Sequence, residues 1–187
     1  MSARSLPDLL ELLAEVFLVP GAFDAQAASE LLDVTWLPAA LRVSLGAMLA
    51  APRLELDVAY AGLFLHGRTR PTIHLQASAQ GYASSALEAD LEDLQAILGA
   101  ADLAPAGTIQ ADHLGALLAL QAGLLRRAAA PDRGAVWETL NRRLLNRHLL
   151  ATGKRVAAAL AEPGVGSFYH AAGSSLAAVL ELCTALC

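Results

Sequence analysis

One leucine-rich stretch decides the fold: residues 112–125 read DHLGALLALQAGLL. Leu and Ala fill most of its positions, and both residue types have high helix propensity. Residues 104–111 precede it, contain Pro and Gly, and are expected to be irregular. Asp112 and His113 therefore stand where an irregular segment meets an apolar helix, with Asp112 in the position of a helix N-cap. Such a position favours binding over core packing.

The remainder of the chain has the same helical character. Hydrophobic residues make up 56% of the 187 residues, whereas charged residues make up 17% and aromatic residues 5%. Ala and Leu carry the apolar excess, and β-branched residues are few. The length suits one domain, residues 1–187, that buries a substantial core. We therefore predict an all-α fold, a single-domain bundle of about nine or ten helices.

Helix boundaries are signalled by capping residues, prolines and glycines. Between the helices, residues 68–84 and 99–111 lack an apolar face, and loops of this length in a helical bundle are usually functional or disordered. We expect a groove between the helices that these two stretches border. The predicted helices cover about 5–18, 24–33, 35–51, 54–65 and 85–96, then a helix that starts at Asp112, then 133–152 with a possible break at Gly153 before 154–161, and 167–187.

Charge patterning predicts a solvated surface and an acidic protein. The acids at positions 88, 90, 92 and 93 form a run of the kind that usually faces solvent. The arginine pairs at 126–127 and 142–143 lie within predicted helices and are expected to form intramolecular ion pairs. The net charge of −5 argues against nucleic-acid binding but is compatible with a basic peptide partner.

The length of the apolar runs and the character of the first ten residues bear on membrane insertion and localisation. Each apolar run is interrupted by a charge, Gly or Pro before it reaches the roughly 20 residues of a membrane span, so no transmembrane segment is expected. The first ten residues, MSARSLPDLL, lack the basic and apolar regions of an export signal. We therefore expect the protein to be cytoplasmic.

The sequence carries no signature of catalysis or of a cofactor. The five histidines show no metal-binding spacing, and Cys183 and Cys187 are interpreted as structural thiols because no further ligands complete a site. Gly164-Val165-Gly166 lacks the strand and the third glycine of a dinucleotide-binding loop. We predict no enzymatic activity, no cofactor and no metal site.

A set of short motifs follows in a fixed order. They are Tyr60-Ala61-Gly62-Leu63-Phe64, then Gly67, Pro71, Ser78 and Tyr82, then Asp112-His113-Leu114-Gly115, then LLNRHL at residues 144–149, and Phe168-Tyr169. In this order and spacing they resemble the TorD/DmsD/NarJ family of all-helical cytoplasmic chaperones, which assist the maturation of molybdopterin-containing oxidoreductases. Two segments depart from the family pattern: residues 109–111 replace a common Glu and Pro, and Thr152-Gly153 replace a Trp.

The resemblance implies a chaperone that binds the twin-arginine signal peptide, the apo catalytic subunit, or both, of a molybdopterin oxidoreductase and assists cofactor insertion before export. Such a peptide presents two arginines followed by an apolar segment, so its receptor needs an apolar groove flanked by carboxylates. Tyr60, Leu63 and Phe64 would form the apolar wall, and Asp112 would bind a guanidinium group beside His113. The full set of expected peptide-binding residues is Tyr60, Leu63, Phe64, Pro71, Ser78, Tyr82, Asp112 and His113.

Structural roles compete with these assignments. Tyr60 and Phe64 are four residues apart on a helix, a spacing more often found in a core. Asp112 is most simply a helix cap, although a cap can also contact a ligand. His113 and His148 are by pattern more often structural than ligand-binding.

Two other functions remain open. One is a NarJ-like assembly factor for a reductase that is not exported, and the other is a helical domain that binds a small ligand or regulates another protein. A monomer is the default oligomeric state. A hinge near residues 99–111 would also permit a domain-swapped dimer, because lengthening a connection costs little loop entropy.

Overall fold

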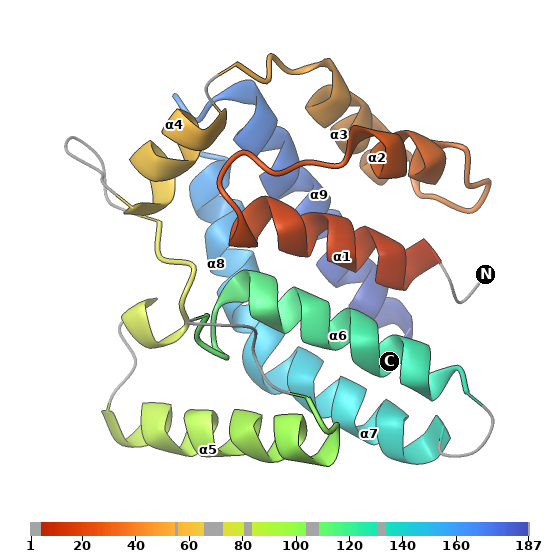
Figure 1. Cartoon of the computed structure of the whole chain (residues 1–187), viewed down its shortest axis with the longest axis vertical. Helices are drawn as coiled ribbons and strands as arrows, with labels where there is room; N and C mark the ends of the chain where they lie inside the picture. The colour runs from red at the N-terminus through yellow and green to blue at the C-terminus, as the bar shows by residue number, and fades with distance from the viewer. Residues whose placement is uncertain are drawn as a thin grey trace.

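The computed structural model describes residues 5–54, 56–65, 73–80, 84–103, 109–130 and 134–186. Within these ranges the regular elements are helical, apart from an isolated antiparallel bridge between Gln76 and His113. The all-α prediction is therefore confirmed. The elements, shown in Figure 1, are α1 (Ser5–Leu18), α2 (Ala25–Leu32), α3 (Ala39–Ala50), α4 (Leu56–Tyr60), the π-helical turn η1 (Ala61–Leu65), the 3₁₀ turn η2 (Ser78–Gln80), α5 (Ser84–Ala100), α6 (Leu114–Ala128), α7 (Gly134–Leu144), the π-helical turn η3 (Leu145–Leu149), α8 (Leu150–Leu160) and α9 (Ser167–Leu186).

Several of these elements are continuous with one another. The turn η1 extends α4, and η3 joins α7 to α8, so the described ranges contain eight continuous helices besides the 3₁₀ turn. The predicted number of nine or ten was slightly too high. The predicted break at Gly153 is wrong, because a Cβ there would lie 2.7 Å from Leu180 Cδ1. Gly153 lets α8 pack closely on α9 and does not end a helix.

Helix starts follow the predicted capping residues in part. Asp24 caps α2, since its Oδ1 accepts a hydrogen bond of 2.9 Å from the Ala27 N–H. The third helix begins after Pro38 and not at Thr35. The helix predicted over 85–96 extends further, from Ser84 to Ala100, and so includes the first residues of the expected irregular stretch at 99–111.

Helix α1 lies at the centre of the core. Figure 1 shows it between α6 on one side and α2 and α3 on the other, and α6 packs against it most extensively. A helix that is apolar on most sides must be covered on most sides. Its exposed stripe is acidic, and Asp8 and Glu11 pair with Arg126 of α6, which confirms the predicted ion-pair role of this arginine. The buried residues of α1 are Leu6, Leu9, Leu10, Leu12, Leu13, Ala14, Val16 and Phe17.

The close approach of α6 to α1 requires a glycine. A Cβ at Gly115 would lie 2.5 Å from Leu18 Cγ and 3.0 Å from the carbonyl oxygen of Ala14. We expect Gly115→Ala to lower the free energy of unfolding by about 1–3 kcal/mol, as overpacking typically does. Denaturation in urea measures this change.

The matched control for Gly115→Ala is Gly46→Ala in α3, where no atom lies within 4 Å of the added Cβ. This substitution is expected to raise stability by up to about 1 kcal/mol, because Ala has the higher helix propensity. Equal effects of the two substitutions would contradict the close-packing role of Gly115.

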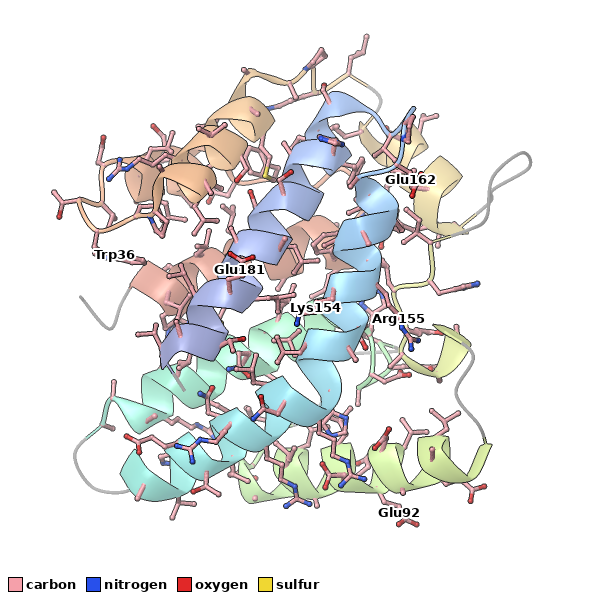
Figure 2. All side chains as sticks on the ribbon, turned by 180° about the vertical axis from the view of Figure 1, so that it is seen from behind. Trp36, Glu92, Lys154, Arg155, Glu162 and Glu181 are labelled. Carbon is pink, nitrogen blue, oxygen red and sulfur yellow. The ribbon has the colours of Figure 1, made fainter. Side chains whose placement is uncertain are left out.

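Helix α5 lies along one edge of the molecule (Figure 1). Leu94, Ile97 and Leu98 form its buried side, while Glu92 points away from the molecule (Figure 2). The prediction of a fully solvated acidic run was wrong at one position, because only 5% of Asp93 is exposed. This residue points inward with the apolar side of the helix, where α7 and η3 supply its partners.

Candidate functional site

An extended segment, residues 73–77, forms backbone hydrogen bonds with η1 at one end and with the start of α6 at the other. At one end the Ile73 N–H donates to the carbonyl oxygen of Leu63, at 2.9 Å. At the other end the Leu114 N–H donates to the carbonyl oxygen of Leu75, at 2.7 Å. The segment therefore brings Leu63 and the Asp112-His113 pair, which are distant in sequence, to the two ends of one strand-like connection.

Asp112 binds this segment instead of capping the helix. Its side chain is buried, and Oδ2 accepts the backbone N–H of Ser78 at 2.8 Å. Helix α6 begins at Leu114, and its N-cap is His113, whose Nδ1 accepts the Gly115 N–H at 3.2 Å. The expectation that Asp112 is the cap was therefore wrong. Its carboxylate turns to a backbone N–H of the neighbouring segment, and the histidine ring takes over the capping bond.

The imidazole of His113 is held in its neutral form. Burial lowers the pKa of His113 below its ordinary value, and the negative charge of Asp112 offsets this only in part. A neutral imidazole has one nitrogen free to accept a hydrogen bond, as the bond from Gly115 requires. His113 therefore stabilises the start of α6 while its half-buried ring stays beside Asp112.

Two of the expected peptide-binding residues lie in the core. Tyr60 is buried, and its hydroxyl donates to the carbonyl oxygen of Phe17 at 2.8 Å. Phe64 is buried against it, with ring centroids 4.8 Å apart, and against Tyr169 at 5.6 Å. Burial raises the pKa of Tyr60, as expected for a phenol inside a core.

The other expected residues are more accessible or undescribed. Leu63 and Ser78 are half-buried at the two ends of the 73–77 segment. Pro71 and Tyr82 lie outside the described residues, as does Gly67. The structure thus brings Leu63, Ser78, Asp112 and His113 to this segment and places Tyr60 and Phe64 in the core.

Three exposed apolar side chains, on and just before α4 and η1, were not predicted from the sequence. Leu54 is 86% exposed, Val58 61% and Leu65 54%. They are spaced by four and seven residues along the chain, with Leu54 two positions before α4, Val58 within α4 and Leu65 at the end of η1. We call Leu54, Val58 and Leu65 the apolar stripe. The same spacing was visible in the sequence, but it did not reveal which side of the helix faces the core.

A small cleft lies between α5, the η3–α8 helix, Ala77 and Asp112, which stands two residues before α6. We call it the α5 cleft. Its volume is about 20 Å³, and its polar lining residues include Asp90, Asp112, Arg147 and Thr152. Carboxylates and leucines occur together in its wall, the combination that a basic, partly apolar ligand group needs. The lining residues are Ala77, Leu87, Asp90, Leu91, Leu94, Asp112, Arg147, His148 and Thr152.

Beside the cleft, Asp93 holds α5 against η3. Its Oδ1 accepts Arg143 Nε at 2.8 Å and Arg147 Nη1 at 3.1 Å, and its Oδ2 lies 2.7 Å from His148 Nε2. We call these four residues the Asp93 cluster. The three partners converge because the π-helical turn places residues four and five apart on one side of the helix. The cluster agrees with the predicted structural role of His148 and the predicted ion-pair role of Arg143.

The electrostatics of Asp93 depend on this cluster. Burial alone would raise the pKa of Asp93, but hydrogen bonds from Arg143 and His148 and the charges of Arg143 and Arg147 outweigh it. The pKa of Asp93 is therefore lower than usual, and the carboxylate stays ionised at neutral pH.

Metal-binding groups and membrane-spanning helices are absent from the residues that the structure describes. Over the described ranges, no group of three or more His, Cys, Asp or Glu side chains is arranged to hold a metal ion. Cys183 is buried in α9, whereas Cys187 lies outside those ranges. No helix in this part of the chain has both the length and the apolar character needed to cross a bilayer.

Comparison with known proteins gives one family match. The family model described as nitrate reductase delta subunit matches residues 24–155. The matched region begins at the cap of α2 and ends within α8, so it includes the apolar stripe, the 73–77 segment, the α5 cleft and the Asp93 cluster. No curated protein and no solved structure matches the chain.

Proposed function

We propose a function from the premise that the chain belongs to the nitrate reductase delta subunit family, the NarJ/TorD type of molybdoenzyme assembly chaperone. The chain binds the twin-arginine signal peptide, the apo catalytic subunit, or both, of a molybdopterin oxidoreductase, here called the client. It holds the client in the cytoplasm until the cofactor has been inserted. The family match over residues 24–155 is the observation that carries this proposal.

The physical chemistry of two surfaces supports peptide binding. The apolar stripe on α4 and η1 offers Leu54, Val58 and Leu65 to the apolar part of a leader peptide, since exposed apolar patches commonly mark interaction sites. Asp112 supplies a carboxylate at the far end of the 73–77 segment. In this arrangement Tyr60 and Phe64 fix α4 and η1 to the core, while Leu63, Ser78 and His113 lie at the ends of the 73–77 segment and would contact the peptide.

A titration tests the peptide role. Wild-type protein is titrated calorimetrically with a synthetic peptide that contains two adjacent arginines followed by an apolar segment. The control peptide has two glutamines in place of the arginines. We expect binding of the first peptide with protection of residues 73–78 and 109–113 from hydrogen exchange, and much weaker binding of the control. Absence of both heat and protection would rule out the signal-peptide role.

Asp112 gives a prediction at the level of one residue. Asp112→Asn keeps an oxygen that accepts the Ser78 N–H but removes the negative charge, so we expect a modest loss of stability. A charged hydrogen bond is stronger than a neutral one by about 1 kcal/mol, so affinity for the arginine peptide should fall about fivefold. The same calorimetric titration measures this loss.

The matched control for Asp112→Asn is Asp102→Asn, which removes the same charge from the exposed turn after α5. Asp102 has a φ of 50°, a conformation that Asn tolerates well. It is expected to bind the peptide as wild type does. If Asp112→Asn also binds like wild type, the carboxylate serves only to hold Ser78.

The description of the matching family favours a second form of the same function. A nitrate reductase delta subunit type of chaperone would act on a reductase that is not exported and would recognise the folded apo-subunit. In that case the apo catalytic subunit co-purifies with the chain, but the isolated arginine peptide gives no heat. Gel filtration of the two proteins, separately and mixed, distinguishes this outcome and also shows whether the chain is a monomer or a swapped dimer.

A further inference from the structure

We propose that the α5 cleft is a subsite for one guanidinium group of the partner polypeptide, and that Arg147 occupies the acidic side of this subsite in the free protein. This inference rests on the proposed function, since it specifies where a basic residue of the client is bound. It adds a feature that the function does not require: the chain carries its own competitor for the site.

The cleft has unused hydrogen-bonding capacity deep in its wall. Thr152 is 1% exposed and lines the cleft, and its Oγ1 has no hydrogen-bond partner among the described residues. A buried hydroxyl without a partner costs free energy, so such groups in folded proteins usually mark a bound water or ligand. Asp112 also lines the cleft, and its Oδ2 accepts the Ser78 N–H. A donor-rich group that enters the cleft therefore meets a hydroxyl and a carboxylate.

Arg147 fills the acidic side of the cleft, where it pairs with Asp90 and Asp93. Its Nε donates to Asp90 Oδ1 at 2.9 Å and its Nη1 to Asp93 Oδ1 at 3.1 Å. The Arg147 side chain is 44% exposed, and ion pairs in such positions contribute little to stability. Arg147 can therefore swing into solvent at low cost.

The consequences of its departure differ for the two aspartates. Asp93 keeps Arg143 and His148 as partners, so the attachment of α5 persists. Asp90, in contrast, forms an ion pair only with Arg147 among the residues that the structure describes. Withdrawal of Arg147 thus leaves the carboxylate of Asp90 without its ion-pair partner in a cleft that Asp112 also lines.

The size of the cleft requires an exchange of one guanidinium for another. A volume of about 20 Å³ accommodates roughly one water molecule. A second guanidinium does not fit beside Arg147, but it fits the space that Arg147 vacates. The planar fork of an incoming arginine matches the carboxylates, while Leu87, Leu91 and Leu94 can cover its methylene stem.

Removal of the competitor is the test. Arg147→Gln, wild type and the control Arg142→Gln, which removes the same charge from the same continuous helix, are each titrated with the arginine-arginine peptide. Wild type must break the exposed ion pairs of Arg147 to admit the peptide, whereas Arg147→Gln has none to break. We therefore expect Arg147→Gln to bind the peptide about two- to fivefold more tightly than wild type. Arg142→Gln is expected to bind as wild type does. Thermal unfolding confirms that each variant is folded.

A second substitution examines the deep end of the cleft. Thr152→Val preserves the shape of the side chain and removes the hydroxyl. In the Arg147→Gln background it is expected to reverse at least half of the gain in affinity, since the incoming guanidinium loses one acceptor. An unchanged affinity would show that the group does not reach Thr152 and would overturn the proposed position.

The outcomes separate this inference from the function on which it rests. An Arg147→Gln variant that binds the peptide no more tightly than wild type overturns the competitor role, even where wild type binds well. Equal gains in Arg147→Gln and Arg142→Gln also overturn it, because they indicate a general effect of charge. Co-purification of the apo catalytic subunit with wild type reports on the chaperone function independently of these titrations.

Discussion

Asp93→Asn lowers the free energy of unfolding by about 3 kcal/mol, the lower end of the range for breaking a buried ion pair. The carboxylate of Asp93 accepts hydrogen bonds from Arg143 and Arg147 and lies 2.7 Å from His148 Nε2. An amide has one acceptor oxygen and no charge, so it cannot satisfy these groups together. Because the two arginines are partly exposed and can turn toward water, the loss stays near the lower end. Urea denaturation measures it.

The control for this substitution lies next to it in sequence. Glu92→Gln changes the same kind of group on α5, but Glu92 points away from the molecule (Figure 2). Its effect is expected to stay within about 0.5 kcal/mol, as for most surface substitutions. Similar losses for both variants would mean that the cluster contributes no more than a surface charge.

The low pKa of Asp93 adds a pH dependence to this prediction. A carboxylate whose pKa is lower in the folded than in the unfolded state stabilises the protein fully above the unfolded value, which is about 3.9. This contribution is lost as the pH falls through the lower folded-state value. The stability difference between wild type and Asp93→Asn should therefore be constant above about pH 5 and shrink below about pH 4. A difference that grows on acidification would contradict the assignment.

Phe64→Ala is expected to lower the free energy of unfolding by about 3–5 kcal/mol, the usual cost of deleting a buried aromatic ring. Phe64 contacts the rings of Tyr60 and Tyr169 and lies 6.2 Å, centroid to centroid, from Phe17. It therefore joins α1, η1 and α9. Removing the ring leaves a cavity at the junction of these elements. Denaturation in urea gives the change in stability.

The neighbouring residue supplies a matched control for Phe64→Ala. Leu65 follows Phe64 in the chain and is exposed, so Leu65→Ala is expected to change stability by less than about 0.5 kcal/mol. It should nevertheless weaken peptide binding, since it shortens the apolar stripe. The opposite pattern, with Phe64→Ala stable and Leu65→Ala unfolded, would contradict the orientation of this helix.

The sequence was sufficient for the helical class and for the boundaries that local chemistry controls. Asp24 is a good example, because an N-cap bond joins residues three apart and needs no tertiary partner. Asp112 has the same local character, but its carboxylate binds Ser78, 34 residues away in the chain. A long-range donor of this kind turns an expected cap into a tertiary contact, and no local pattern reports it.

Residues of the candidate site could be named from the sequence, but how their side chains lie in the fold could not. Leu63 and the Asp112-His113 pair lie at the two ends of the 73–77 segment, whereas Tyr60 and Phe64 are buried. Which side of α4 and η1 faces the core depends on the packing of Phe64 against Phe17 and Tyr169. Asp93 was missed for a related reason: one acid in a run of four is buried only because of how α5 docks on η3.

The central claim is that the chain assists cofactor insertion into a molybdopterin oxidoreductase. The most direct test is the molybdenum content, per polypeptide, of a catalytic subunit from the same organism, produced with and without the chain and purified identically. We expect a several-fold higher molybdenum content when the chain is present, at equal yield of the polypeptide. Equal molybdenum content in the two preparations would contradict it.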